Sequence, residues 1–200
     1  MQNKPASTQV PIHHLMQSRW SPRALDPART VSDADLTALL EAARWAPSCF
    51  NDQPWRYIVC VKNKAADSWE LALACLVEKN QLWAKNAPVL ILAIAMDHFK
   101  HNGKANRWAH YDTGAASLSL CLQATALGMV THQMGGFDAD KAREVFQLPE
   151  GCTPLSMIAV GYQADSEQLA EEFKAAEDAE RVRAALDGQF FLGAWGKPVV

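Results

Sequence analysis

The sequence predicts a single domain of mixed structure, either α/β or α+β, and three observations support this. Apolar residues make up 49% of the 200 residues, which is enough for the core of one domain. Residues 88–96 (PVLILAIAM) form a continuous apolar run with the length of a strand that is covered on both faces. Segments with helical spacing of apolar residues alternate with such short apolar runs along the chain.

Two helices are expected in the N-terminal quarter. Residues 12–17 form a short helical candidate that ends before the break at Ser21 and Pro22. Ser32 is the expected N-cap of a helix that runs to about Arg44, because serine caps helices and acidic residues follow it in the first turn.

The middle of the chain alternates strands and helices. Strands are expected at 56–61 and 88–96, helices at 65–78 and 108–127, and a polar loop at 97–107. The proline at the start of the second run and its lack of polar residues predict a central, buried strand.

The C-terminal part begins at Gly128, which occupies the place of a left-handed helix cap. We expect a short helix at 139–146, a strand at 155–161 and one or two polar surface helices within 166–186. The tail, 188–200, carries aromatic residues with nothing of their own to pack on, which predicts docking on another part of the fold or on another subunit.

Composition excludes several classes of protein. Lys and Arg number 19 against 22 Asp and Glu, a net charge of −3, so neither a nucleic-acid footprint nor a polybasic membrane patch is expected. The five cysteines form no C-x-x-C pair, which favours reduced thiols in a cytoplasmic compartment. No metal-ligand pattern is present, the N-terminus lacks a signal-peptide core, and the most apolar stretch, 114–127, is shorter than the roughly 20 residues of a membrane span.

Motifs that are absent narrow the chemistry further. The chain has no G-x-G-x-x-G opening a helix, no Walker loop, no G-x-S-x-G elbow and no H-E-x-x-H. A dinucleotide held in a Rossmann crevice is therefore disfavoured.

The first candidate segment is 18–23 (SRWSPR). Arg19 and Arg23 bracket Ser21, and guanidinium groups match phosphate oxygens in pairs while the hydroxyl adds a further partner. The alternative is that both arginines are surface ion-pair residues beside an ordinary Ser-Pro turn.

Two further segments offer polar or flexible backbone. In 46–55 (APSCFNDQPW), Asn51 and Gln53 can read the donor and acceptor edge of a planar ligand, or Asn51 simply caps a proline-punctuated connection. In 133–137 (QMGGF), paired glycines allow a ligand to approach the backbone, or the segment is a plain loop.

The order and spacing of these segments resemble the FMN-dependent nitroreductase family. The matching motifs are S-R-x-S-P-R, A-P-S-x-x-N-x-Q-P-W-x-x-I-V at 46–59, A-P-V-L-I at 87–91, D-T-G-A-A-S-L-S-L-x-L-x-A-x-x-L-G at 112–128, G-G-F at 135–137 and a closing K-P at 197–198. The resemblance covers nearly the whole chain. It implies an α+β sandwich, a mostly antiparallel sheet wrapped by helices, in an intertwined homodimer with FMN at each interface.

The resemblance also implies residue roles. Arg19 and Ser21 would hold the FMN phosphate, and Arg23 would lie near the N1/O2 edge of the flavin. The residues implied to bind the cofactor are Arg19, Trp20, Ser21, Arg23, Pro47, Ser48, Cys49, Asn51, Asn80, Gln133, Met134, Gly135, Gly136 and Lys197.

Within this set, the loop 47–51 would reach the cofactor from the partner subunit, and 134–136 would line the ring near N5. Either Asn80 or Gln81 would lie beside the pyrimidine end, and Lys197 would give a late cation to the phosphate. The chain departs from the family pattern at Trp20, Cys49, Gly135 and Gly196.

The activity implied is an FMN-dependent oxidoreductase that works by a two-step exchange. NAD(P)H reduces the flavin and leaves, and an electron-poor acceptor such as a nitroaromatic, a quinone or an activated alkene is then reduced. No side chain is expected to be catalytic, because the cofactor carries the reaction. The alternatives are an FMN enzyme of another branch (dehalogenation, desaturation or flavin cleavage) and a flavin-binding dimer without turnover. As a single domain of residues 1–200, the chain is expected to have a flexible segment at 1–11 and a tail that docks on the partner.

Overall fold

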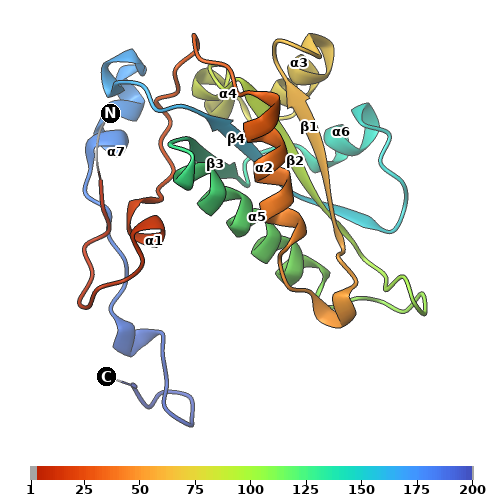
Figure 1. The fold of residues 1–200 in the computed structure, drawn as a ribbon, viewed down its shortest axis with the longest axis vertical. Helices are drawn as coiled ribbons and strands as arrows, with labels where there is room; N and C mark the ends of the chain where they lie inside the picture. The colour runs from red at the N-terminus through yellow and green to blue at the C-terminus, as the bar shows by residue number, and fades with distance from the viewer. Residues whose placement is uncertain (1–3, 200) are drawn as a thin grey trace.

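The computed structural model describes residues 4–199, which form a four-stranded antiparallel sheet with helices on both faces (Figure 1). The strands are β1 Trp55–Val61, β2 Val89–Met96, β3 Val130–Met134 and β4 Cys152–Gly161, in the order β1-β2-β4-β3. The helices are α1 His14–Ser18, α2 Asp33–Arg44, α3 Ala66–Ala74, α4 Glu78–Ala84, α5 Ala109–Ala126, α6 Ala139–Val145 and α7 Glu171–Asp178, with 3-10 turns η1 Cys49–Asn51, η2 Ser166–Gln168 and η3 Leu186–Gly188. The α+β alternative is confirmed, because every strand pairing is antiparallel.

The strand expected at 88–96 is central and buried. β2 pairs with β1 on one side and with β4 on the other. Leu90 and Leu92 face the core under α3, α4 and α6, whereas Val89 and Ile91 face the core under α2 and α5. Both faces of β2 are covered, which explains why its sequence is continuously apolar rather than alternating.

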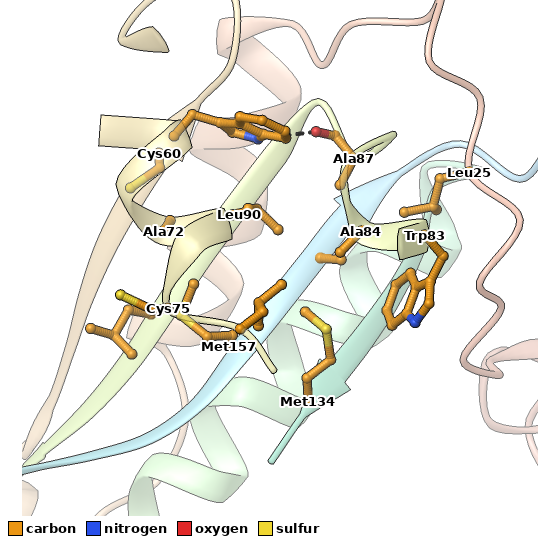
Figure 2. Packing of buried hydrophobic residues seen from close by; sticks show 14 of the residues in the cluster. Leu25, Cys60, Ala72, Cys75, Trp83, Ala84, Ala87, Leu90, Met134 and Met157 are labelled. Carbon is orange, nitrogen blue, oxygen red and sulfur yellow. Dashed lines mark hydrogen bonds between the residues drawn. The ribbon is translucent and has the colours of Figure 1, made fainter. Parts of the chain in front are cut away.

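The core under α3 and α4 reaches the edge strand β3. Figure 2 shows Trp83 of α4 close to Met134 of β3, with Met157 and Leu90 filling the space toward α3. These side chains are at most 3% exposed. The close packing fixes the end of β3, from which the glycine pair continues.

Local signals predicted two helix ends. Ser32 caps α2, since its Oγ accepts a hydrogen bond from the amide of Asp35 at 3.0 Å. Gly128 has φ +71°, the left-handed conformation expected of a glycine after a helix.

The helix expected at 65–78 is confirmed as α3, but its end is wrong, because α3 ends at Ala74; α4, which begins at Glu78, was not predicted. The chain between them pairs with the segment that follows β3: Leu76 forms a bridge with Phe137, and the Val77 amide donates to the Gly136 carbonyl at 3.1 Å. This pairing of distant segments withdraws residues 75–77 from the helix. It also places α4 beside the glycine pair.

Three other boundaries differ from the expectation. β3 was not predicted, and β4 begins at Cys152 rather than at residue 155. Pro154 is tolerated within β4 because the register shifts there, between Ala93 and Ile94 of β2. Of the polar segment 166–186, only η2, α7 and the first residue of η3 are helical.

The C-terminal tail extends away from the sheet (Figure 1). Phe190, Leu192 and Trp195 are 52%, 67% and 91% exposed. Docking of this tail on a partner subunit stays a prediction. At the other end, Lys4 and Ala6 hydrogen-bond to α7 and α1, and residues 1–3 of the segment expected to be flexible lie outside the described residues.

Candidate functional site

The Arg19–Arg23 segment connects α1 to the body of the protein beside β3. Arg19 ends α1 in an extended conformation, and its Nη1 lies 3.4 Å from Ser21 Oγ. Pro22 is buried, and its carbonyl accepts a hydrogen bond from Nδ1 of His132 in β3 at 3.1 Å. The buried proline therefore anchors a segment whose two arginines remain partly accessible.

His132 is held neutral in this arrangement. Burial lowers its pKa to about 4, with the positive charge of Arg23 acting in the same direction and the backbone carbonyl of Pro22 opposing it. Its ring packs on Trp83 with centroids 4.6 Å apart. Because a carbonyl only accepts, the neutral ring carries its proton on Nδ1. The sequence analysis did not identify this residue as part of the site.

Residues of β3 and helix α1 both lie beside α5. Gln133 Nε2 donates to Cys121 Sγ of α5 at 3.4 Å. Burial raises the pKa of the Cys121 thiol, and hydrogen bonds from Thr131 and Gln133 together with the charge of Arg19 oppose that rise. Helix α1, which is followed by Arg19 and the half-buried Trp20, packs on α5.

The glycine pair continues from the end of β3. A Cβ on Gly135 would meet nothing within 4 Å, whereas a Cβ on Gly136 would lie 2.8 Å from Asn80 Nδ2. Asn80 Nδ2 donates to the Gly136 carbonyl at 3.0 Å, while Gln81 Nε2 donates to the Leu76 carbonyl. The structure thus brings Asn80, rather than Gln81, to the glycine pair. Met134, directly before the glycine pair, is 3% exposed, and its side chain packs in the core (Figure 2).

The second group of predicted residues lies in the loop between α2 and β1. Ser48 Oγ accepts from the Gln53 amide at 3.0 Å, and the Cys49 amide donates to Asp112 Oδ2 of α5 at 3.0 Å. Three non-glycine residues here have positive φ: Phe50 at 54°, Asn51 at 53° and Gln53 at 49°. Left-handed conformations of such residues are strained and persist only where the surroundings hold them. Pro47 is exposed at the start of this loop.

One chain does not bring the two groups together. The loop with Cys49 attaches to Asp112 in the first turn of α5, whereas Gln133 contacts Cys121 further along the helix. Nine residues of α-helix span about 13 Å. Figure 1 shows α1 and the loop after α2 well apart.

Lys197 is also remote from the other predicted residues. Among the described residues, the hydrogen bonds of 186–199 all lie within this tail segment, including the one from the Leu192 amide to the Lys197 carbonyl at 2.7 Å. The contact of Lys197 with a phosphate stays a prediction.

A pocket of about 670 Å³ lies between residues 6–12 and 181–186, and Arg19 lines it. The volume suits a small ligand. Of the predicted site residues, however, only Arg19 is found in the described lining, so the pocket is separate from the glycine pair and from the loop 47–51.

Residues 4–199 contain no group of three or more His, Cys, Asp or Glu side chains arranged to hold a metal ion. Within the same residues, no helix is long and apolar enough to cross a membrane.

The structure is an antiparallel sheet covered by helices, with a cationic segment and a glycine pair beside the edge strand β3. Comparison with known protein families identifies the class to which it belongs. The model of the nitroreductase family matches residues 16–162. The chain belongs to the nitroreductase family.

Three proteins illustrate how similar the chain is to known sequences and structures. A solved structure described as an oxidoreductase containing FMN is 36% identical, with a TM-score of 0.89 over 98% of this chain and 100% of its own. A 15.4 kDa protein of Mycolicibacterium smegmatis is 32% identical over 135 residues, 68% of this chain and 90% of that protein. The major NAD(P)H-flavin oxidoreductase of Aliivibrio fischeri is 35% identical over 82 residues, 41% of this chain and 38% of that enzyme.

Proposed function

We propose that the protein is an FMN-dependent oxidoreductase that takes electrons from NAD(P)H and passes them to a small electron-poor acceptor, such as a nitroaromatic, a quinone or an activated alkene. The observation that carries the proposal is that the cationic Arg19–Arg23 segment and the open backbone at Gly135 both adjoin β3 in a nitroreductase-family chain. A relative described as containing FMN and another named for NAD(P)H and flavin support the choice of cofactor and electron donor.

The residues present fit FMN. The Arg19 guanidinium and the Ser21 hydroxyl suit a phosphate dianion, because charge-assisted hydrogen bonds of this kind are the strong ones. Space for an added Cβ at Gly135 is empty, so a flat ring system can approach the backbone there. Arg23 would place a positive charge near the N1/O2 edge of the ring and favour negative charge at that edge.

When bound, FMN supplies the hydride and electron transfer, and the protein binds, orients and tunes it. Arg19 and Ser21 would hold the phosphate end. Asn80, already fixed on Gly136, would present its amide group near the ring. No side chain of the chain is required as a nucleophile or as a dedicated acid.

We also infer a homodimer, in which the loop 47–51 of a second copy completes each site. This explains why the single chain keeps that loop apart from Arg19. Trp108, Tyr111 and Leu118, at or near the exposed side of α5, are 42%, 76% and 44% exposed. They therefore do not pack in the core of this chain, and exposed apolar patches mark interaction surfaces. Light scattering on the purified protein should give about twice 22.0 kDa, and a monomer mass would contradict the dimer.

A cytoplasmic location is part of the same proposal. Cys49, Cys60, Cys75, Cys121 and Cys152 are all free thiols. Reduced cysteines are typical of the cytoplasm. Fractionation of cells that express the protein tests this inference.

The decisive experiment is a visible spectrum of the purified protein followed by anaerobic reduction. We expect the absorption bands of oxidised flavin at about 450 and 370 nm. NADH or NADPH should bleach these bands, and a quinone or nitroaromatic should restore them. A protein that takes up no FMN overturns the proposal. A bound flavin that NADH and NADPH leave oxidised would instead identify a flavin-binding dimer without turnover, and a reduced flavin that these acceptors leave reduced would point to another branch of the family.

A further inference from the structure

Glu177 of α7 places a buried carboxylate against the Arg19–Arg23 segment. The residue is 1% exposed. Its carboxylate accepts hydrogen bonds from the Arg23 amide at 2.9 and 3.0 Å and from the Ala24 amide at 3.1 Å. A buried charge is costly unless it is fully hydrogen-bonded, so a carboxylate in this place needs those two amides. The backbone direction at Arg23 is thereby fixed by a residue 154 positions away in the sequence.

Arg181, just beyond α7, holds the other end of the segment. Its guanidinium donates to the carbonyls of Lys4 and Gln17 at 2.7 Å each and to the Arg19 carbonyl at 2.9 Å. Burial lowers the pKa of Arg181, and the neighbouring charge of Arg19 adds to this effect. The fork geometry of the guanidinium is what allows one side chain to bind several carbonyls at once.

Both residues lie beyond 16–162, the range matched by the family model. The segment they hold carries Arg19 and Ser21 of the proposed phosphate site, and Arg23, which is proposed to lie at the edge of the ring. The backbones of Arg19 and Arg23 are occupied by Arg181 and Glu177, whereas their guanidinium groups remain partly accessible. A ligand anion would therefore meet side chains whose backbone is already ordered, which lowers the entropic cost of binding.

We propose that Glu177 and Arg181 are positioning residues that order the Arg19–Arg23 segment for the phosphate of the flavin cofactor. The proposal rests on the proposed function, since it assigns the segment to FMN. Neither residue needs to touch the cofactor. A residue that only attached the C-terminal segment to the domain would change the binding of every flavin alike, whereas a residue that orders the phosphate site changes the preference for FMN over riboflavin, which lacks the phosphate.

The test is Glu177→Gln, which keeps the size of the side chain and removes the charge. Glu172→Gln is the matched control, because Glu172 lies on the same helix and is exposed. Dissociation constants for FMN and riboflavin are measured by flavin fluorescence titration of the flavin-free protein, together with its circular dichroism and melting curve. We expect Glu177→Gln to weaken FMN binding about tenfold, because the segment must then be ordered when the ligand binds. Riboflavin binding should weaken less, because riboflavin meets Arg23 at the ring but lacks the phosphate that Arg19 and Ser21 would hold. Glu172→Gln should leave both constants as in the unmodified protein.

Equal loss of FMN and riboflavin binding, or no loss of either, would overturn the positioning role of Glu177. If Glu177→Gln does not fold, Arg181→Lys carries the test, because an ammonium cannot reproduce the three-carbonyl fork and the same fall in FMN preference is expected. Arg181→Lys with full FMN preference overturns the proposal in that case.

The two proposals fail in distinguishable ways. An unmodified protein that binds neither FMN nor riboflavin refutes the proposed function. An unmodified protein that prefers FMN, together with variants that keep this preference, refutes only the positioning role.

Discussion

The Cys49 amide donates a hydrogen bond to Asp112 Oδ2 at 3.0 Å, which ties the loop before β1 to the first turn of α5. Asp112 is 5% exposed. The loop that it anchors contains Phe50, Asn51 and Gln53, all with positive φ. A strained loop of this kind depends on its tether, because the left-handed conformation of each non-glycine residue costs about 1–3 kcal/mol.

Asp112→Ala removes that tether. The Cys49 amide would lose its partner, and we expect the free energy of unfolding to fall by about 1–3 kcal/mol. Urea denaturation of the flavin-free protein measures this. Glu144→Ala, which removes an exposed carboxylate on α6, is the control and should stay within about 0.5 kcal/mol of the unmodified protein. Equal stability of the two variants would show that the Asp112 contact does not hold the loop.

The two neighbouring glycines should respond differently to alanine. Gly136→Ala places a Cβ 2.8 Å from Asn80 Nδ2, so Asn80 must swing away and lose its bond to the Gly136 carbonyl, at a cost of about 1 kcal/mol in stability. Gly135→Ala meets nothing within 4 Å and should leave stability unchanged. It should nevertheless weaken FMN binding, because the methyl group enters the space assigned to the ring. Urea titration of both variants measures the free energy of unfolding, and FMN titration measures the dissociation constant. Unchanged FMN affinity in Gly135→Ala would contradict the placement of the flavin ring beside Gly135.

Arg19→Ala should weaken FMN binding by about 1.5–3 kcal/mol, which is roughly ten- to more than a hundredfold in the dissociation constant. The backbone contact of Arg19 with Arg181 is kept in this variant, so the fold is expected to persist. Arg44→Ala, an exposed arginine on α2, is the matched control. Unchanged FMN affinity in Arg19→Ala would refute its placement at the phosphate.

The lowered pKa of His132 predicts that the folded protein loses stability in acid. Its pKa is lowered from 6.5 to about 4 in the folded protein, chiefly by burial, so between these values the unfolded chain binds more protons than the folded one. Stability is therefore present above pH 6.5 and is lost as the pH falls toward 4, by about 2 kcal/mol at pH 5. His132→Gln removes this contribution. The difference in unfolding free energy between pH 7 and pH 5 should be smaller by about that amount in the variant, and equal differences would contradict the assignment.

Much of the fold could be predicted because its signals are local. The cap at Ser32, the glycine after α5 and the apolar run of β2 each depend on neighbours in the sequence, and the structure confirms all three. β3 was missed because it is a short edge strand, Val130–Met134, in which polar residues interrupt the apolar ones. The helix expected at 65–78 extends past the end of α3, because residues 75–77 look helical until they pair with the segment after β3, and α4 was not predicted.

The sequence predicted which residues belong to the candidate site but not which of them contact one another. Asp112 entered the sequence analysis only as the first residue of the motif at 112–128, and its partner Cys49 lies 63 positions away. Glu177 and Arg181 gave no signal at all, since they stand in a polar segment that reads as an ordinary surface helix.

The sequence by itself determined the class of fold, the central buried strand, the two helix ends at Ser32 and Gly128 and the family motifs, because capping, turn chemistry and hydrophobic periodicity act between near neighbours. Only the tertiary structure decided that Asn80 rather than Gln81 adjoins the glycine pair, that the loop 47–51 lies apart from Arg19, and that Glu177 fixes the Arg23 backbone. These relationships join residues tens of positions or more apart, and no periodicity records which distant hydrogen-bonding groups must meet once a core has formed.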